Sequence, residues 1–375
     1  MTRLFIVADG DPRQRSTNSG VANGVLSAFS SRADCTVVGF SSTAPSGALR
    51  LILALVTFRP SRRWWWATFN LGAMNIRIRS WQRDRSASQA DDFDFVLQVR
   101  NIYYPSSHPY LVFIDSTSAM ANANWAAWKP SRSLQALRRR IEAKQFAESA
   151  HIFTAGPQAA ASVVNDYGIQ QSKVTAVGGG INFDTLPDVN AVTQHRLNRD
   201  PEILFVGVDF QRKGGDLLVS AFTQLVARHP RLRLTLVGGR PTAFIPHSNI
   251  RILGQITDRE EMASLYSDAT IFCLPARHEP YGLVLQEAMA FSLPCVATDI
   301  GAIASIVDHG STGLVIPPEN ISALIKALEL LIDQPDVAAK FGQAGRSKAQ
   351  ASLTWDAVAS RMIAALDSEK SAQDV

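Results

Sequence analysis

The chain has 375 residues, of which 46% are hydrophobic and 19% charged, and its formal net charge at pH 7 is +4. Intrinsic disorder is excluded, because a disordered chain would carry fewer apolar residues and more net charge, and the length favours two domains. Three cysteines are too few, and odd in number, for a disulfide framework. Cys273 and Cys295 lie in apolar runs, so we interpret them as core residues in a reducing compartment.

Short apolar strands alternate with helix-like runs along the whole chain. In the first half, a strand at 4–8 and a small-residue loop at 16–20 precede a helix at 21–31, and further strands follow at 36–40, 95–99, 110–114 and 151–154. In the second half, strands at 203–206, 232–237, 270–274 and 294–298 alternate with helices at 214–228, 259–268, 281–291 and 321–333. Such runs suit parallel sheets that are buried on both faces. We therefore predict α/β architecture with two Rossmann-like, doubly wound domains, divided at the polar stretch 184–200.

Charge is unevenly distributed between the two halves. Residues 1–150 contain 19 Lys or Arg against 10 Asp or Glu, and the remainder is mildly acidic. The segment Arg50–Arg85 holds eight arginines, one acid and four of the seven tryptophans. This mixture is typical of a membrane-interface segment, but it also fits helices packed at a domain rim or a clamp for single-stranded nucleic acid.

The sharpest local signal is the run 277–290, which follows a predicted strand and opens a helix. Its carboxylates Glu279 and Glu287 stand eight residues apart. We expect Glu279 in the loop before the helix and Glu287 one turn inside, where it would reach a ribose diol. The alternative is a loop acid followed by a solvated helix acid.

The start of the same helix is a candidate anion site. Gly282 would let the backbone approach a ligand closely. The first amides, those of Leu283 and Val284, would then face an anion at the helix N-terminus.

A second signal is the loop 207–216, which begins at Gly207 and lies between a strand and a helix. Its adjacent cations Arg212 and Lys213, followed by two glycines, suit a diphosphate. The loop is not a P-loop, and an exposed basic turn is the alternative. A third signal is Gly20, in the first βα turn, although that turn lacks the dinucleotide-binding pattern.

Together, these stretches resemble glycosyltransferase family 4. The resemblance covers most of the chain and is strongest in the second half. The matching stretches are the E-x7-E signature at 279–287, the donor-phosphate loop at 205–214, the tail at 297–318, the N-terminal glycine loop at 19–22 and the end of the N-terminal domain at 167–182.

The resemblance implies a GT-B fold, with two Rossmann-like domains facing a central cleft. The expected domains are 1–183 for the acceptor, 184–354 for the nucleotide-sugar donor, and a helix at 355–375 that crosses back to the first domain. It also implies sugar transfer with retention at the anomeric carbon, without a metal or other cofactor.

Residue roles follow from the same resemblance. Lys213, Arg212 and the helix start after Gly282 would stabilise the leaving diphosphate, Glu279 would hold the donor sugar's hydroxyls, and Glu287 would hold the ribose. Stabilisation of the charge that develops in the transition state is usually the largest single contribution to catalysis.

The sequence departs from the family pattern at several positions. Asp115 stands in the run 113–117 where many members have a histidine near the reacting bond. Val208 and Asp209 stand where an arginine is common, so Arg212 would substitute. Ser292 replaces a common glycine and Ser305 a common acid.

We therefore predict a retaining glycosyltransferase that acts on a polysaccharide or lipid-linked acceptor. Alternatives are a non-catalytic scaffold of a surface-polysaccharide assembly, or an epimerase or phosphorylase on the same fold. The N-terminal apolar run is too short for a signal peptide. We accordingly expect a cytoplasmic protein, peripheral to the inner face of an anionic membrane through Arg50–Arg85, and no nucleic-acid partner.

Overall fold

The computed structural model describes residues 1–125, 130–197, 199–239 and 247–373. The chain divides into two compact units, which we call unit 1 (Met1–Gly179 with Trp355–Val375) and unit 2 (Gly180–Thr354). The division falls between Gly179 and Gly180 rather than after residue 183. The helix that begins at Trp355 belongs to unit 1.

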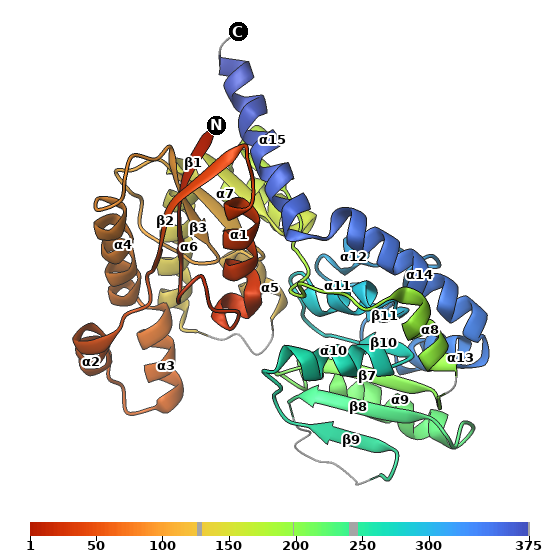
Figure 1. The fold of residues 1–375 in the computed structure, drawn as a ribbon. Helices are drawn as coiled ribbons and strands as arrows, with labels where there is room; N and C mark the ends of the chain where they lie inside the picture. The colour runs from red at the N-terminus through yellow and green to blue at the C-terminus, as the bar shows by residue number, and fades with distance from the viewer. Residues whose placement is uncertain (126–129, 198, 240–246, 374–375) are drawn as a thin grey trace. The chain divides into compact units, whose positions relative to one another are not determined.

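Unit 1 is built on a parallel sheet of six strands in the order β2-β1-β3-β4-β5-β6 (Figure 1). Its strands are β1 (Thr2–Ala8), β2 (Cys35–Ser42), β3 (Phe95–Val99), β4 (Tyr110–Ile114), β5 (His151–Thr154) and β6 (Val174–Ala176). Its helices are α1 (Val21–Ser30), α2 (Gly47–Val56), α3 (Arg62–Leu71), α4 (Ala73–Ala87), α5 (Ser118–Asn124), α6 (Arg132–Glu148), α7 (Pro157–Tyr167) and α15 (Trp355–Gln373), with 3-10 turns η1 (Thr17–Gly20) and η2 (Gln171–Lys173). Strands β3, β4 and β5 have the predicted bounds.

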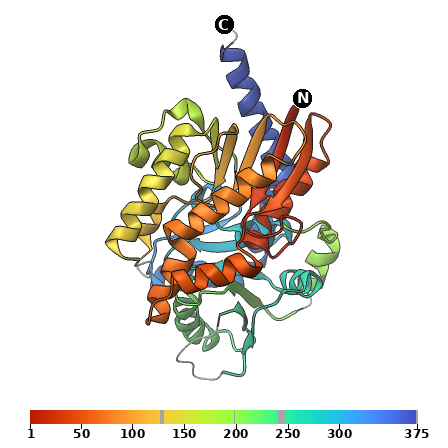
Figure 2. The same cartoon turned by 90° about the vertical axis from the view of Figure 1, so that its left-hand side faces the viewer.

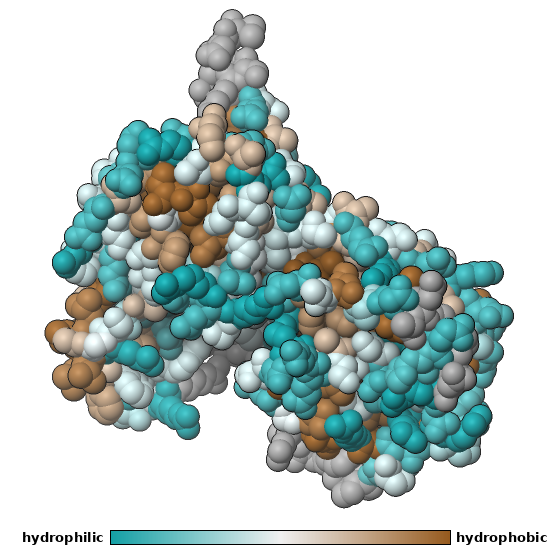
Figure 3. All heavy atoms as spheres, in the orientation of Figure 1, coloured by the Kyte–Doolittle hydropathy of each residue, from teal (hydrophilic) through white to brown (hydrophobic). Residues whose placement is uncertain are grey.

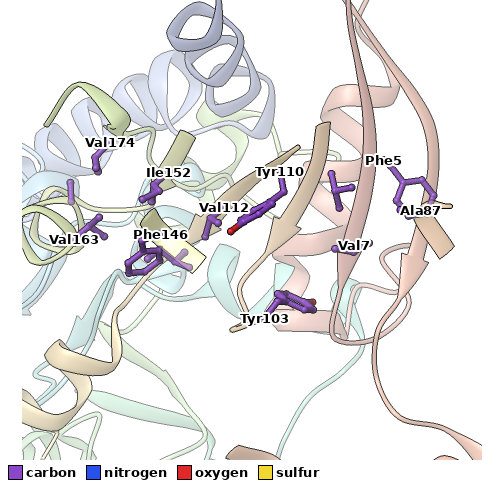
Figure 4. Packing of buried hydrophobic residues seen from close by; sticks show 13 residues of the cluster. Phe5, Val7, Ala87, Tyr103, Tyr110, Val112, Phe146, Ile152, Val163 and Val174 are labelled. Atoms are coloured by element: carbon purple, nitrogen blue, oxygen red, sulfur yellow. The ribbon is translucent and has the colours of Figure 1, made fainter. Parts of the chain in front are cut away.

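The core of unit 1 lies on the faces of this sheet, as the continuous apolar runs predict. Every residue of β4 is buried. Figure 4 shows side chains of β1, β4 and β5, such as Val7, Val112 and Ile152, packing with Phe146 of α6 and Val163 of α7. Burial on both faces requires helices on both sides, and this explains the alternation of strands and helices along the chain.

The C-terminal helix α15 is fixed to unit 1 by its first residues. The indole of Trp355 lies where a Cβ on Gly24 of α1 would stand. The Arg32 guanidinium donates to Asp356 (3.1 Å) and to Ser360 (2.7 Å). Close packing and these bonds make α15 an integral part of unit 1.

Unit 2 repeats the architecture with a parallel sheet in the order β12-β11-β10-β7-β8-β9. Its strands are β7 (Glu202–Gly207), β8 (Arg233–Gly238), β9 (Ile250–Leu253), β10 (Ile271–Leu274), β11 (Cys295–Thr298) and β12 (Gly313–Ile316). Its helices are α8 (Val189–Leu197), α9 (Gly215–Val226), α10 (Arg259–Asp268), α11 (Leu283–Ala290), α12 (Ile303–Ile306), α13 (Ile321–Asp333) and α14 (Pro335–Ser352). Two Rossmann-like, doubly wound units were predicted, and the structure confirms them.

Each sheet has one point at which the strand order reverses. In unit 1 this switch point lies between β1 and β3, and in unit 2 it lies between β7 and β10. Ligands of open α/β sheets bind beside the carboxyl ends of the strands at such a point. The topology therefore directs attention to the loops after β7 and β10 in unit 2, and to those after β1 and β3 in unit 1.

The Arg- and Trp-rich segment forms helices α2, α3 and α4, which lie on the outside of unit 1. Figure 2 shows these orange helices facing the viewer. Not all of the segment is exposed, because Arg79 and Arg83 of α4 point inward and are buried. Arg79 donates to Asp9 (2.8 Å), and Arg83 donates to the Tyr104 carbonyl (2.7 Å).

The three cysteines are reduced and buried. Burial raises the pKa of the Cys35 thiol to about 11 and raises those of Cys273 and Cys295 still further. The expected role of Cys273 and Cys295 as core residues is confirmed. Within the described ranges, none of the helices combines the length and apolarity that crossing a bilayer requires.

Candidate functional site

The loops after β7 and β10 meet at the carboxyl edge of the unit 2 sheet. The Arg277 amide donates to the Arg212 carbonyl (2.8 Å). Gly214 has a φ of 74°, and a Cβ built on it would overlap the Pro275 carbonyl. Only glycine combines that backbone conformation with so close an approach. The glycine therefore brings the basic loop against the loop that carries Glu279.

Lys213 and Glu279 form an ion pair across these two loops. Both side chains are largely buried, with 13% and 10% of their surfaces exposed. A Cβ on Gly207 would lie 2.9 Å from the Lys213 side chain, so this glycine leaves room for the lysine stem. An ammonium and a carboxylate interact strongly in a largely buried site, because little water screens them. A ligand phosphate would compete with the Glu279 carboxylate for Lys213.

Arg212 also joins the two loops. Its Nη1 donates to the His278 carbonyl (2.9 Å), and its Nε donates to Asp209 (3.3 Å). Asp209 further accepts from the Arg212 amide (3.2 Å). Asp209 thus orients Arg212. It stands where the resemblance leads one to expect an arginine.

The N-terminus of α11 lies in the same place. The helix begins at Leu283, immediately after Gly282, rather than at the predicted residue 281. Gly282 has a φ of 112°, which an L side chain rarely adopts. As in any helix, the first amides, those of Leu283 and Val284, lack intrahelical acceptors. This end of α11 is therefore suited to an anion.

Glu287 lies inside α11, buried and surrounded by donors. It accepts from the Tyr266 hydroxyl (3.1 Å), from the Arg259 guanidinium (3.2 Å) and from the side-chain amide of Asn182 (3.5 Å). Burial is the main cause that raises the pKa of Tyr266 well above its usual range, and the neighbouring Glu287 carboxylate is the next. The Arg259 guanidinium lies 3.9 Å from the centre of the Phe183 ring. Glu287 is therefore held in one orientation by its neighbours.

Sequence reasoning missed the residues that support this site. Arg277 pairs with Asp216 of α9 (2.6 Å) and with Glu319 (2.5 Å). The Asp216 hydrogen bond, more than any other cause, raises the pKa of Arg277. Arg277 directly precedes the recognised motif, and that adjacency was a usable signal. The distant partner Glu319 gave none.

Two predicted site residues lie in unit 1. Gly20 caps α1 with a φ of 84°, after Asn18 and Ser19, which are also left-handed. Asp115 follows β4 and pairs with Arg100, whose Nη1 donates to the Asn18 carbonyl (2.9 Å). Gly20 and Asp115 thus share the carboxyl edge of the unit 1 sheet, whereas the other predicted residues gather in unit 2.

Among the described residues, one group of three potential metal ligands lies together: His229, Glu329 and Asp333. His229 follows the C-terminal end of α9, whereas Lys213 precedes its N-terminal end. Glu329 is already paired with Arg228 (2.6 Å). This group is therefore not part of the arrangement around Lys213.

Comparison with known proteins finds a family model that matches the part of the chain carrying this arrangement. Residues 191–348 match the family model described as glycosyl transferases group 1. Glycogen synthase of Mycobacterium tuberculosis is 26% identical over 269 residues, which cover 67% of this chain and 61% of the relative. A mannosyltransferase of Corynebacterium glutamicum, named as GDP-mannose-dependent and acting on a monoacylated phosphatidylinositol monomannoside, is 31% identical over 172 residues, 42% of this chain and 45% of the relative. The chain spans less than two thirds of the length of these relatives.

Solved structures support the fold over nearly the whole chain. Sucrose-phosphate synthase of Thermosynechococcus elongatus superposes with a TM-score of 0.72 at 20% identity, covering 99% of this chain and all of that one. The predicted GT-B fold class is thus confirmed. The resemblance to a glycosyltransferase family is confirmed by the model match.

Proposed function

We propose that this chain, whose residues 191–348 match the model of the glycosyl transferases group 1 family, transfers a sugar from a nucleotide-sugar donor to a glycan or lipid-linked acceptor. One observation carries the proposal. Lys213, Arg212 and the start of α11 gather at the switch point of unit 2, inside the matched region. Cations, glycines and a helix N-terminus are the chemistry that holds a diphosphate.

The proposed chemistry is retaining and needs no metal. As the bond between sugar and diphosphate breaks, negative charge grows on the phosphate oxygens. Lys213, Arg212 and the amides of Leu283 and Val284 would stabilise that charge without reorganising. Losing one such donor costs about 10²–10³ in rate.

Donor binding would exchange the partners of the buried ion pair. The phosphate would take Lys213, and Glu279 would then accept from the hydroxyls of the donor sugar. Glu287 already accepts from Tyr266 and Arg259. An ionised carboxylate has about four acceptor sites, so Glu287 retains capacity for a ribose hydroxyl.

Asp115 would supply the contribution of unit 1 near the reacting bond. Arg100 holds its carboxylate at the carboxyl edge of the sheet, where α/β ligands bind. Gly20 would let a ligand approach the backbone at the same edge.

The acceptor would be a polysaccharide or a lipid-linked glycan, reached from the cytoplasmic face of a membrane. One relative is named for a lipid-linked acceptor. The exposed apolar and basic helices α2 and α3 of unit 1 support a peripheral association.

A thermal-shift titration with GDP, UDP, ADP and their sugars, in the presence of a chelator, tests the donor site. Ligands that bind only the native state raise its apparent stability. We expect a shift with one nucleotide, lost in Lys213→Ala and retained in Lys326→Ala, an exposed lysine of α13. Absence of any shift would favour a scaffold.

Turnover then separates the remaining enzymatic alternatives. A glycosyltransferase consumes its donor in proportion to acceptor, whereas an epimerase needs no acceptor. Donor conversion that is independent of acceptor would contradict the proposed transfer.

A further inference from the structure

The outer face of α2 is apolar, and none of the described residues of unit 1 buries it. Leu51, Ile52, Leu55 and Val56 recur at the spacing of one helix face, and the exposed fractions of Leu51 and Leu55 are 68% and 77%. Leu53 is the one residue of α2 that is fully buried. Large contiguous apolar patches on soluble proteins mark interaction sites. In Figure 3, hydrophobic atoms gather at the left edge, where Figure 1 draws α2.

The tryptophans of α3 divide between the interior and this surface. Trp65 packs inward, with its indole N–H donating to the Ala54 carbonyl (3.2 Å) and its ring 6.1 Å from that of Phe58. Trp64 and Trp66 are exposed. Exposed tryptophan beside apolar surface is typical of the boundary between lipid headgroups and acyl chains.

Helix α4 continues the surface with a cationic stripe. Met74, Arg77, Trp81 and Arg85 lie at intervals of three and four residues, on the face opposite the buried Arg79 and Arg83. No ion pair involves Arg77 or Arg85 among the described residues, and Arg85 lies 5.3 Å from the Trp81 ring centre.

A groove of about 450 Å³ lies between this stripe and the segment 104–105. Asp84 also lines the groove, but Arg83 (2.9 Å) and Ser106 (2.6 Å) already donate to its carboxylate. The groove therefore presents the charge of Arg77 and Arg85.

The positive charge of this surface indicates which kind of partner covers it. Asp84 is the single acid between residues 43 and 90, while the exposed Arg50, Arg59 and Arg62 add positive charge to α2, to the loop after it and to α3. A second copy would bring these arginines face to face, whereas anionic lipid complements them. We propose that this docking surface (α2, α3 and the Arg77–Arg85 stripe) binds an anionic phospholipid bilayer. The apolar face of α2 lies at the acyl boundary, and Arg77 and Arg85 hold lipid phosphates. This deepens the proposed function by naming its membrane partner.

Co-sedimentation with phosphatidylcholine vesicles, with and without phosphatidylglycerol, tests the proposal. Each arginine near an anionic surface contributes about a fivefold factor. The variant Arg77→Gln/Arg85→Gln should therefore weaken binding to the phosphatidylglycerol vesicles roughly 30-fold. The matched control Arg231→Gln/Arg251→Gln removes two exposed charges from unit 2 and should leave binding nearly unchanged. Leu51→Ser/Leu55→Ser should weaken binding while leaving its dependence on phosphatidylglycerol.

Equal losses in the α4 variant and the unit 2 control would show that only net charge matters, and would overturn the proposal. So would a Leu51→Ser/Leu55→Ser variant that dissociates a dimer, by light scattering, without changing vesicle binding. The nucleotide thermal shift keeps the two proposals apart. If the wild-type protein shows the nucleotide shift but does not bind the phosphatidylglycerol vesicles, the docking proposal fails and the donor site stands. If it binds the vesicles but shows no nucleotide shift, the donor site fails and the docking proposal stands.

Discussion

Both units carry a parallel six-stranded sheet with one switch point, but they shape the edge at that point by different means. In unit 2, glycines supply the left-handed backbone, at Gly214 and Gly282. In unit 1, Gly10 and Gly20 also have positive φ, but so do Asn18, Ser19 and Arg100, which are not glycine. A non-glycine residue there costs about 1–2 kcal/mol, so something must hold it.

In unit 1 the holding group is the Arg100 side chain. The Arg100 guanidinium bonds both the Asn18 carbonyl and the Asp115 carboxylate. The Arg100 backbone amide donates to the Phe113 carbonyl (2.7 Å). Strained backbone clusters at functional sites, where surrounding contacts over-determine it. The comparison teaches that glycines supply the left-handed backbone at the edge of unit 2, whereas the edge of unit 1 also uses residues other than glycine, which side-chain bonds hold.

The largest expected effect comes from removing the Lys213 charge at the edge of unit 2. Lys213→Ala should lower kcat/KM by about 10²–10³, because the departing diphosphate loses a positioned charge. Steady-state kinetics with the nucleotide-sugar found by thermal shift measure this. Lys326→Ala is the control, and equal rates in the two variants would contradict a role for Lys213.

The second prediction compares two left-handed glycines, one in each unit. Gly214→Ala should lower the free energy of unfolding by about 3 kcal/mol, because the left-handed penalty of about 1–2 kcal/mol adds to overpacking against Pro275. Gly168→Ala has a similar φ of 70° but open space around it, so only the penalty of about 1–2 kcal/mol applies. Denaturant unfolding measures both. Equal losses would mean that the close approach of the unit 2 loops is unimportant.

The third prediction concerns the edge of unit 1. Arg100→Gln and Asp115→Asn should each lower kcat about tenfold, since each breaks a charge-assisted bond worth about 1.5–3 kcal/mol. Because the two residues act as a pair, the double variant should lose little more than either single variant. Arg100→Lys should recover part of the rate. Unchanged turnover in the single variants would remove Asp115 from the proposed site.

Local signals in the sequence predicted most of the strands, although β6, β9 and β12 were not predicted. Apolar runs predicted β3, β4 and β5. Glycines beside cations predicted a diphosphate site in the loop 207–216, and the structure brings this loop against the loop of Glu279. Arg100 could not be predicted, because its partners Asn18 and Asp115 are distant in the sequence. Ser292 shows the same limit: its φ of 57° explains why glycine is common there, and Arg196 donates to its carbonyl (2.9 Å).

The smallest predicted effect contrasts the buried glutamates of the two units. Glu279 and Glu287 of unit 2 face cations, whereas Glu142 of unit 1 accepts from the Tyr167 hydroxyl and from the Ser118 amide (2.9 Å), with Arg138 on its own helix. Burial is the main cause that raises the pKa of Glu142. Between the ordinary glutamate pKa and the raised native value, the native state therefore holds more protons at Glu142 than the unfolded chain does.

That difference has a definite sign. The stabilising contribution of protonated Glu142 is complete below the ordinary glutamate pKa and is lost as pH rises through the raised native value. Relative to Glu142→Gln, the wild-type free energy of unfolding should fall from about pH 5 upward, by at most about 1.4 kcal/mol per pH unit. Urea unfolding at a series of pH values measures the difference. Parallel curves for the two proteins would show that Glu142 titrates alike in the native and unfolded states, so that its hydrogen bonds and Arg138 offset the effect of burial.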